Sequence, residues 1–286
     1  MYHTTNETTT TVGLCTATVI EGTEDGLYTM ELVYPRYIHS ELMTHRVFSR
    51  NASSSRATPV EKIIKEVMDN PVIPNEVYKN CKGMSGKEKL NEEELNSFRI
   101  IWKCARDDVI YWAERLKEMG IHKQTVNRLL EPFSFIRTIV TATEWKNFYN
   151  LRLSKAAQPE IRDLAKAMID AQAKYELPPY NFNDAYCAYW IFPYVSDEEN
   201  KDLSIIDAIK VSAARCARVS YLQNDDYTPA DIKKDLELAE RLLKEGHMSP
   251  FEHQIYHNDN LPCGWYYNLY GKYQSARYIL EQNSLV

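Results

Sequence analysis

Glycine is scarce in this chain, and its cysteines are not paired along the sequence. Only 9 of the 286 residues are glycine, and none of the six cysteines belongs to a CxxC pair. The first fact excludes collagen-like and low-complexity chains, and the second indicates neither a zinc site nor a disulfide framework. No apolar run approaches the ~20 residues that span a bilayer, and no signal peptide opens the chain. We therefore expect a cytoplasmic protein with no membrane partner.

Several common catalytic signatures are also missing. The chain has no GxGxxG after a strand, no GxxxxGK[ST], no HExxH and no GxSxG, which excludes the usual dinucleotide, nucleotide-triphosphate, zinc-protease and serine-hydrolase sites. His253 and His257 are four residues apart, but no Cys or Asp cluster accompanies them and we predict no metal. The net charge of −6 argues against a broad nucleic-acid-binding face, so a small anionic ligand is expected instead.

What the chain does have is a segment rich in hydrogen-bond donors at 44–57. Its sequence, THRVFSRNASSSRA, holds one histidine, three arginines, one asparagine and four serines. A guanidinium binds two oxygens of an anion at once, and serine hydroxyls supply further donors, so this composition suits a phosphate. The alternative is an ordinary solvated polar loop.

Hydrophobic periodicity predicts a mixture of strands and helices. The predicted strands are 11–20 and 27–34, which form a hairpin, and 133–140. The predicted helices are a turn at 37–43, then 60–68, 98–119, 143–173 with a break at Pro159, 207–219, and a last helix that starts at Thr228 and stops at Gly246. We expect residues 1–10 to be frayed, 177–193 to be a connection, and the apolar stripe of 98–119, which includes Trp112 and Met119, to be buried.

Further amide and basic side chains lie in two later segments. Arg128 precedes Pro132, and Asn147 and Arg152 lie on the predicted helix 143–152 among Phe148, Tyr149 and Leu151. Polar groups among apolar ones are costly when buried without partners. We therefore expect Asn147 and Arg152 to have partners or a ligand, unless they form a solvated helix face.

Two of these segments resemble the motifs of the flavin-dependent thymidylate synthases. The run from Thr44-His45-Arg46 to Arg56 is similar to the family signature, which begins Arg-His-Arg and has a serine eight residues after the second arginine, here Ser54. The run Asn150-Leu151-Arg152, followed by AQPEI at 157–161, resembles a second family block. The resemblance implies an α+β fold, in which helices pack on an antiparallel sheet.

A third similarity lies in an unusual place. Segments 212–221 and 246–253 are similar to segments that precede the Arg-His-Arg motif in most family members, but here they follow it. We infer a circularly permuted or rearranged member, of a kind similar to bacteriophage proteins, which would place it in the host cytoplasm. We expect a core at 1–176, a connection at 177–205, and a segment at 206–286 that resembles the family's N-terminal part and packs into the same domain.

The resemblance also implies roles for individual residues. A flavin, FAD, would contact His45, Arg46, Asn51, Asn147, Ser249 and Glu252. The phosphate of dUMP, or of a related pyrimidine nucleotide, would be held by Ser54, Ser55, Arg56 and Arg128. The catalytic pair would be Arg152, which favours the ionised N3 form of the uracil, and His247, which lines the pocket. NADPH and methylene-tetrahydrofolate would be co-substrates of a homotetramer that has no stable nucleic-acid partner.

The sequence departs from the family pattern at several positions. Thr44 replaces the first arginine of the signature, and four further positions differ: Glu41, Ala52, Ser55 and Thr141. Arg50 offers a replacement cation. The main prediction is reductive methylation of dUMP to dTMP. Two alternatives stay open: flavin-dependent hydroxymethylation of dUMP or another pyrimidine nucleotide, and a non-catalytic nucleotide- or RNA-binding protein.

Overall fold

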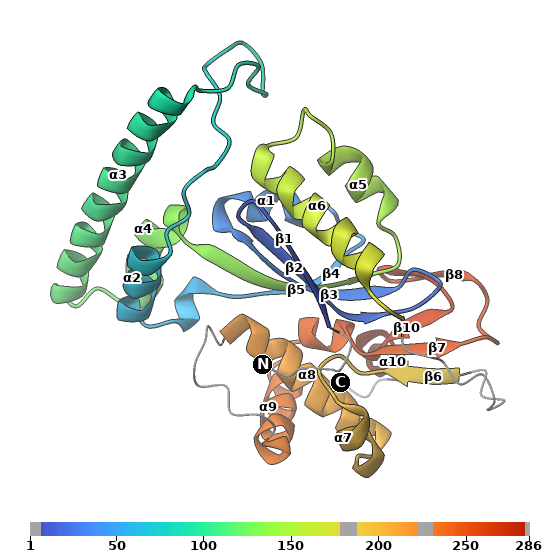
Figure 1. Cartoon of the computed structure of the whole chain (residues 1–286). Coiled ribbons are helices and arrows are strands. Elements are labelled where there is room, and N and C mark those ends of the chain that lie inside the picture. Colours follow the sequence, from blue (N-terminus) through green and yellow to red (C-terminus); the bar gives the residue numbers. More distant parts are fainter. Residues whose placement is uncertain (1–6, 178–187, 222–230, 284–286) are drawn as a thin grey trace.

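The computed structural model describes residues 7–177, 188–221 and 231–283, and it is centred on an antiparallel sheet. The sheet has five strands in the order β1-β2-β3-β5-β4. Its strands are β1 (Thr8–Val12), β2 (Cys15–Gly22), β3 (Tyr28–Pro35), β4 (Ser49–Ala52) and β5 (Phe135–Ala142). With helices packed on both of its faces (Figure 1), this is the expected α+β architecture.

The first three strands form a meander. The predicted hairpin is confirmed as β2 and β3, with a register shift between Val19 and Glu21. The expectation that residues 1–10 are frayed is wrong for Thr8 to Thr10, which belong to β1 and pair with β2. Residues 1–6 lie outside the described residues. The threonine hydroxyls of β1 bond across to β2, Thr9 to Thr18 at 2.9 Å and Thr11 to Thr16 at 3.0 Å. Such cross-strand threonine pairs stabilise a sheet.

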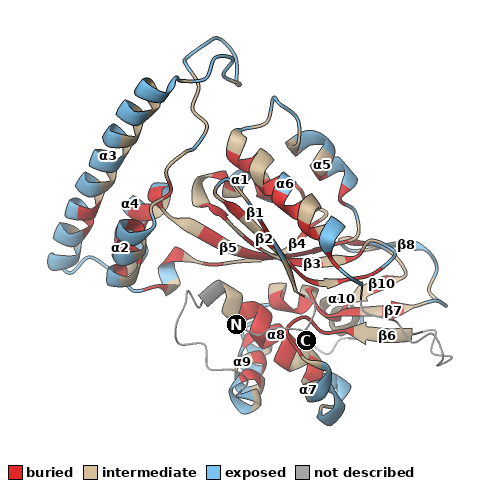
Figure 2. Cartoon of the chain, viewed as in Figure 1, coloured by how far each residue is buried: buried red, intermediate tan, exposed pale blue. Residues whose placement is uncertain are grey.

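One face of the sheet is covered by α6 (Pro159–Lys174), with α5 (Lys146–Arg152) beside it. Pro159 stands in the first turn of α6, where the missing N–H costs nothing. Ile161, Leu164 and Met168 repeat at helical spacing and pack on the inward side chains of β2 and β3, which forms the main core. Figure 2 shows this buried stripe along α6.

The other face is covered by the C-terminal part of the chain. α8 (Ile205–Tyr221) packs on β4 and β5 and against α9 (Ile232–Lys244), with the short α7 (Asp197–Asp202) nearby. The start of α9 differs from the prediction. Thr228 lies outside the described residues, and the N-cap is Asp231, whose side chain accepts a hydrogen bond from the backbone N–H of Lys234.

A small second sheet completes the C-terminal part. It has the order β10-β7-β6, formed by β6 (Ala188–Ile191), β7 (Ile255–Asn258) and β10 (Tyr273–Ser275). A separate two-stranded hairpin joins β8 (Gly264–Tyr266) and β9 (Leu269–Gly271), and α10 (Ala276–Gln282) follows β10. The segment 177–205, expected to be a connection, thus contains β6 and α7. No helix among the described residues is both long enough and apolar enough to cross a bilayer.

Three helices form a unit beside the main sheet. They are α2 (Val60–Asp69), α3 (Glu92–Glu118) and α4 (Lys123–Leu130), and they share a core of their own. The expectation of a fully buried stripe on α3 is wrong, because Trp112 and Met119 are 59% and 72% exposed. Only the side of α3 that carries Ile110 and Ala113 is buried, and most of the helix faces outward (Figure 2).

Candidate functional site

The donor-rich segment 44–57 is positioned by the edge of the main sheet. It follows the short helices η1 (Arg36–Ile38) and α1 (His39–Met43), runs along β4, and ends in the 3₁₀ turn η2 (Ser55–Ala57). β4 pairs with β5 on one side only, so it is an edge strand of this sheet. Both α8 and the 3₁₀ turn η4 (Ser249–Glu252) pack against β4. Three distant parts of the chain therefore meet here.

At the start of the segment, His45 is buried among aromatic rings and contacts Arg152. Its ring stacks on Phe48, with centroids 5.9 Å apart, and meets the edge of Phe148 at 4.8 Å. The Nε of Arg152 donates a hydrogen bond to Nε2 of His45 at 2.9 Å. Burial, with the charges of Arg152 and Arg50, lowers the pKa of His45 to about 4. His45 is therefore a neutral imidazole with its proton on Nδ1.

Thr44 helps to hold the same arginine. The Nη2 of Arg152 donates to Thr44 Oγ1 at 3.0 Å and to the Glu41 carbonyl at 3.2 Å. The Thr44 hydroxyl in turn donates to the Glu41 carbonyl at 2.7 Å. Where the family signature has an arginine, this chain thus has a neutral acceptor that accommodates Arg152 without repulsion between two cations.

Arg50, the possible replacement for the missing signature arginine, is already bonded to the protein backbone. Its Nη1 donates to the carbonyls of Met43 and His45, at 2.8 and 3.3 Å. These bonds tie β4 to the end of α1. Burial lowers the pKa of Arg50, and the nearby charge of Glu252 opposes that shift. Arg50 therefore holds the turn in place, in addition to contributing charge.

Asn51 joins the first segment to the last. Its Nδ2 donates to the Cys216 carbonyl on α8 at 2.9 Å, and its Oδ1 accepts from Ser249 Oγ at 3.4 Å. Glu252, at the end of η4, accepts a hydrogen bond from Arg277 of α10 at 2.6 Å. The structure therefore brings Asn51 and Ser249 into contact, and Glu252 is oriented by a residue that the motifs did not include.

The C-terminal end of the segment, to which the resemblance assigns phosphate binding, is held by α4. Asn127 is fully buried, and its Nδ2 donates to the carbonyls of Ser55 and Thr58, at 2.7 and 3.0 Å. Lys123 Nζ donates to the Ala57 carbonyl at 2.9 Å. Ser54 is half-buried and Arg56 is exposed, and neither side chain has a partner within 7–177, 188–221 and 231–283. The backbone is therefore fixed while these two donors remain available.

The side chains of Ser55 and Arg128 are both engaged. Ser55 Oγ and Arg128 Nη1 donate to the same oxygen of Glu131, at 2.7 and 2.8 Å. Glu131 begins the 3₁₀ turn η3 (Glu131–Phe133) after α4. The contact between Arg128 and Glu131 could have been expected from the sequence, because the two residues are three positions apart on a helical segment.

Other implied residues stay apart from this cluster. Asn147 is exposed on α5, which agrees with the alternative of a solvated helix face. His247 is exposed and lies with Nε2 3.5 Å from Glu245 Oε2. Arg46 is exposed and makes no hydrogen bond or ion pair within the described part of the chain. Within one chain these three side chains face outward.

Thr141 is buried in the protein core and, within the part of the chain that the structure describes, does not line a pocket that contains the candidate site residues. Its hydroxyl bonds to Thr29 Oγ1 and to Nδ1 of His253, both at 2.8 Å, and all three residues are buried. Burial lowers the pKa of His253 to about 3, so this imidazole is neutral. Among the described residues, no group of three His, Cys, Asp or Glu side chains could hold a metal ion.

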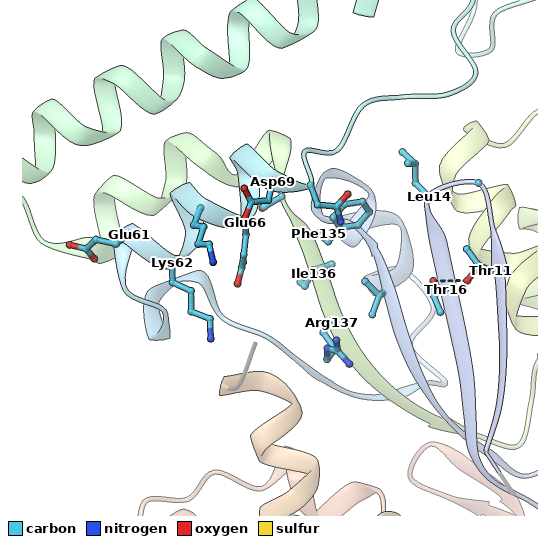
Figure 3. Close-up of a pocket in the computed structure, with 15 residues that line it drawn as sticks. Thr11, Leu14, Thr16, Glu61, Lys62, Glu66, Asp69, Phe135, Ile136 and Arg137 are labelled. Carbon is cyan, nitrogen blue, oxygen red and sulfur yellow. Dashed lines mark hydrogen bonds between the residues drawn. The ribbon is translucent and has the colours of Figure 1, made fainter. Parts of the chain in front are cut away.

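A cavity of about 940 Å³ lies elsewhere, between α2 and the turn that joins β1 and β2 (Figure 3). Arg137 of β5 lines it together with charged residues of α2. The lining has both signs of charge, with Lys62 and Glu66 on α2 itself. None of the site residues implied by the motifs is among its lining residues, so this cavity is separate from the candidate site.

Comparison with known proteins identifies the family. The model of the family described as thymidylate synthase complementing protein matches residues 21–178. The flavin-dependent thymidylate synthase of Thermococcus onnurineus is 29% identical over 143 residues, 49% of this chain and 51% of that protein. That of Pyrococcus abyssi is 28% identical over 138 residues, 48% and 50% of the two chains. The protein belongs to the thymidylate synthase complementing protein family, and it spans about half the length of these curated relatives.

Solved structures overlap with part of the chain. A UMP/dUMP methylase, PolB from Streptomyces cacaoi bound with 5-Br UMP, superposes with a TM-score of 0.44 at 20% identity, covering 52% of this chain and 69% of that one. The flavin-dependent thymidylate synthase ThyX from Helicobacter pylori, complexed with FAD and dUMP, gives a TM-score of 0.36 at 22% identity and covers 51% and 67%.

Proposed function

We propose that the protein is an enzyme that transfers a one-carbon unit to C5 of a pyrimidine deoxynucleotide, with dUMP converted to dTMP. FAD is the bound cofactor, and methylene-tetrahydrofolate and NADPH are co-substrates. One observation carries the proposal: Arg152 contacts His45 and Ser249 contacts Asn51, so three distant segments with family-like motifs meet at β4. Family membership and the curated relatives support the same reaction class.

The phosphate of the nucleotide is bound by the end of the segment. Arg56 offers a guanidinium that is exposed and has no partner within the described residues, and Ser54 offers a hydroxyl beside it. A guanidinium fork and a hydroxyl are well suited to a phosphate dianion. Asn127 and Lys123 hold the backbone carbonyls of this turn, so the donors are positioned before the ligand arrives.

The uracil base is placed against Arg152. A fixed guanidinium favours the ionised form of a nearby acidic N–H, which here is N3 of the uracil. Ionisation raises the electron density of the ring, which favours bond formation at C5. Arg152 is oriented by His45 and Thr44, both of which accept its hydrogen bonds, so its planar fork is held before the base is bound.

A thiol nucleophile is not part of the proposal. Burial raises the pKa of the thiols of Cys15 and Cys216, so both are protonated at neutral pH and are poor nucleophiles. Cys81, Cys104 and Cys263 are exposed thiols outside the cluster at β4, and Cys187 lies outside the described residues.

The flavin site is proposed beside the nucleotide site. The Asn51 amide, the Ser249 hydroxyl and the exposed guanidinium of Arg46 provide hydrogen-bonding and cationic groups that a flavin nucleotide requires. The neutral His45, buried against Phe48, supports this end of the segment. Glu252 is fixed at the edge of this set by Arg277. FAD, when bound there, supplies the redox chemistry of the one-carbon transfer. Asn147 and His247, which face outward, join the site from a neighbouring subunit of a homotetramer.

The rearranged order of segments belongs to the same proposal. In this proposal the segment 206–286 takes the structural place of the family's N-terminal part. The packing of α8 and η4 on β4 and the hydrogen bonds of Asn51 to Cys216 and Ser249 support it. Residues 7–177 and this segment then form one domain with one site.

Product mass tests the reaction. The purified protein is incubated with FAD, NADPH, methylene-tetrahydrofolate and either dUMP or dCMP, and the nucleotide product is weighed. A methyl group added to dUMP is the expected result. A hydroxymethyl product would show that the alternative reaction, hydroxymethylation, takes place instead of methylation. The observation that favours this alternative is that Thr44, which contacts Arg152, stands where the family signature has an arginine. A colourless protein that does not bind added FAD would overturn both enzymatic proposals and favour non-catalytic nucleotide or RNA binding.

A further inference from the structure

A single carboxylate engages two of the groups proposed to bind phosphate. Glu131 Oε1 accepts hydrogen bonds from Ser55 Oγ at 2.7 Å and from Arg128 Nη1 at 2.8 Å. Hydrogen bonds between ions, or between a hydroxyl and an ion, are stronger than neutral ones. The side chain of Glu131 is 23% exposed and that of Arg128 is 59% exposed, so the pair lies at the border between the protein and solvent.

The space behind Glu131 is too small for a second anion. A cavity of about 10 Å³ is enclosed by residues that include Arg36, Ser55, Asn127 and Glu131. Such a volume holds about one water molecule. Arg36 Nε and Asn127 Oδ1 are buried there and have no hydrogen-bond partner within the described residues. A phosphate that uses the Ser55 hydroxyl must therefore take the place of the Glu131 carboxylate.

Glu131 is not needed to hold the backbone of the turn. Lys123, Asn127 and Glu131 lie four residues apart and face the same turn, but only the first two bind backbone carbonyls, those of Ser55, Ala57 and Thr58. Glu131 contacts the Ser55 hydroxyl and the Arg128 guanidinium. Loss of its charge therefore frees two donors while the two backbone anchors remain.

We propose that Glu131 is an internal competitor for phosphate, which occupies the Ser55 and Arg128 donors in the ligand-free protein and is displaced by the phosphate of the bound nucleotide. This inference rests on the proposed function for the nucleotide, but the competition itself concerns any phosphate. Glu131 is then a residue that sets phosphate affinity: it lowers the affinity for the phosphorylated ligand and leaves the affinity for the unphosphorylated nucleoside unchanged.

The test compares Glu131→Gln with the unmodified protein. The glutamine amide can still accept a hydrogen bond from the Ser55 hydroxyl, but it carries no negative charge with which to compete against phosphate for Arg128. Glu118→Gln is the matched control, because Arg115 Nη1 and Glu118 Oε2 are 2.7 Å apart in another i,i+3 pair, on α3. Isothermal titration measures the affinities for dUMP, deoxyuridine and inorganic phosphate. Glu131→Ala is measured in parallel, and thermal unfolding confirms that each variant is folded.

The expected result for Glu131→Gln is a gain of roughly tenfold in affinity for dUMP and for inorganic phosphate, the size expected for release of the one charged donor, Arg128. Glu131→Ala releases both donors, so its gain should be at least as large. Deoxyuridine affinity and the Glu118→Gln control should not change. Equal or weaker phosphate binding by folded Glu131 variants would overturn the inference. A gain for inorganic phosphate with no binding of dUMP by any variant would support the role of Glu131 and contradict the proposed function.

Discussion

The Nε atom of Arg152 lies 2.9 Å from Nε2 of His45, although 107 residues separate them in the sequence. A protonated imidazole could not accept this hydrogen bond, because both of its nitrogens would be donors. The contact and the burial of the ring both favour the neutral form, and they lower the pKa of His45 from 6.5 to about 4. The two residues are therefore coupled, so that protonation of His45 would break its hydrogen bond with Arg152.

This coupling predicts that acid destabilises the protein through His45. The unfolded chain binds a proton at His45 below about pH 6.5, whereas the folded chain binds it only below about pH 4. The contribution to stability is therefore complete above pH 6.5 and is lost as the pH falls towards 4. Urea unfolding at pH 7.5 and pH 5 measures it. His45→Gln, which keeps an acceptor for Arg152, should show a smaller loss between the two pH values, and an unchanged loss would refute the assignment.

Replacement of Arg152 should affect turnover more than stability. The residue ends α5 and is only half-buried, so Arg152→Ala should remain folded. Loss of one fixed cation at the reacting group lowers turnover by roughly a hundredfold or more in comparable sites. Arg152→Lys keeps the charge but loses the planar fork, and we expect an intermediate rate. Rates of dTMP formation at saturating dUMP, together with circular dichroism, make the comparison. Full activity in a folded Arg152→Ala variant would remove the residue from the mechanism.

Asn51 should stabilise the contact between the N-terminal and C-terminal segments. Asn51→Ala removes the donor to the Cys216 carbonyl and the acceptor for Ser249. A half-buried amide with such partners contributes roughly 1–3 kcal/mol to the free energy of unfolding. Asn150→Ala is the control, since that asparagine is exposed on α5. The midpoints of urea unfolding should fall for the first variant alone, and equal midpoints would show that the contact does not stabilise the fold.

Local sequence patterns predicted the elements better than their contacts. The stripe of Ile161, Leu164 and Met168 has helical spacing and gave α6 directly. The start of β1, from Thr8 to Thr10, was missed because the first ten residues are polar and rich in threonine, although β-branched residues also favour strands. Trp112 was expected to be buried because it belongs to the apolar stripe of 98–119, but α3 packs along one side only.

Within the site, contacts between residues that lie far apart in the sequence were the hardest to predict. Motif spacing located His45, Asn51, Arg152 and Ser249, and the structure shows contacts in the pairs His45–Arg152 and Asn51–Ser249. The contact of Glu252 with Arg277 carries no local signature, because the two residues belong to different elements and meet only after folding. The pair Arg128–Glu131 could have been predicted from its i,i+3 spacing on a helical segment. The contact of Glu131 with Ser55 could not, because the two residues are 76 positions apart in the sequence.

Arg215 is fully buried on α8, in the segment 212–221 that resembles the family. Its Nε donates to Asp235 at 3.0 Å, and its Nη2 donates to Glu199 at 2.6 Å. Without Arg215, the buried Asp235 still pairs with Arg218 Nε at 2.9 Å, but Glu199 loses the guanidinium that pairs with it. Removal of one partner of a buried ion pair costs about 3–5 kcal/mol when no other cation compensates the remaining charge. Arg215→Met should therefore lower the free energy of urea unfolding by an amount between this value and the roughly 0–1 kcal/mol of an exposed pair.

Arg115→Met is the control for this variant, because Arg115 forms a surface pair with Glu118 and its side chain is 53% exposed. Exposed pairs contribute about 0–1 kcal/mol, since water screens both charges. The two variants remove the same kind of side chain, so the difference between them measures the effect of burial. If Arg215→Met were as stable as Arg115→Met, then the ion pairs of Arg215 would not fasten α8 to α7, and the Arg218–Asp235 pair would be enough to hold α8 against α9.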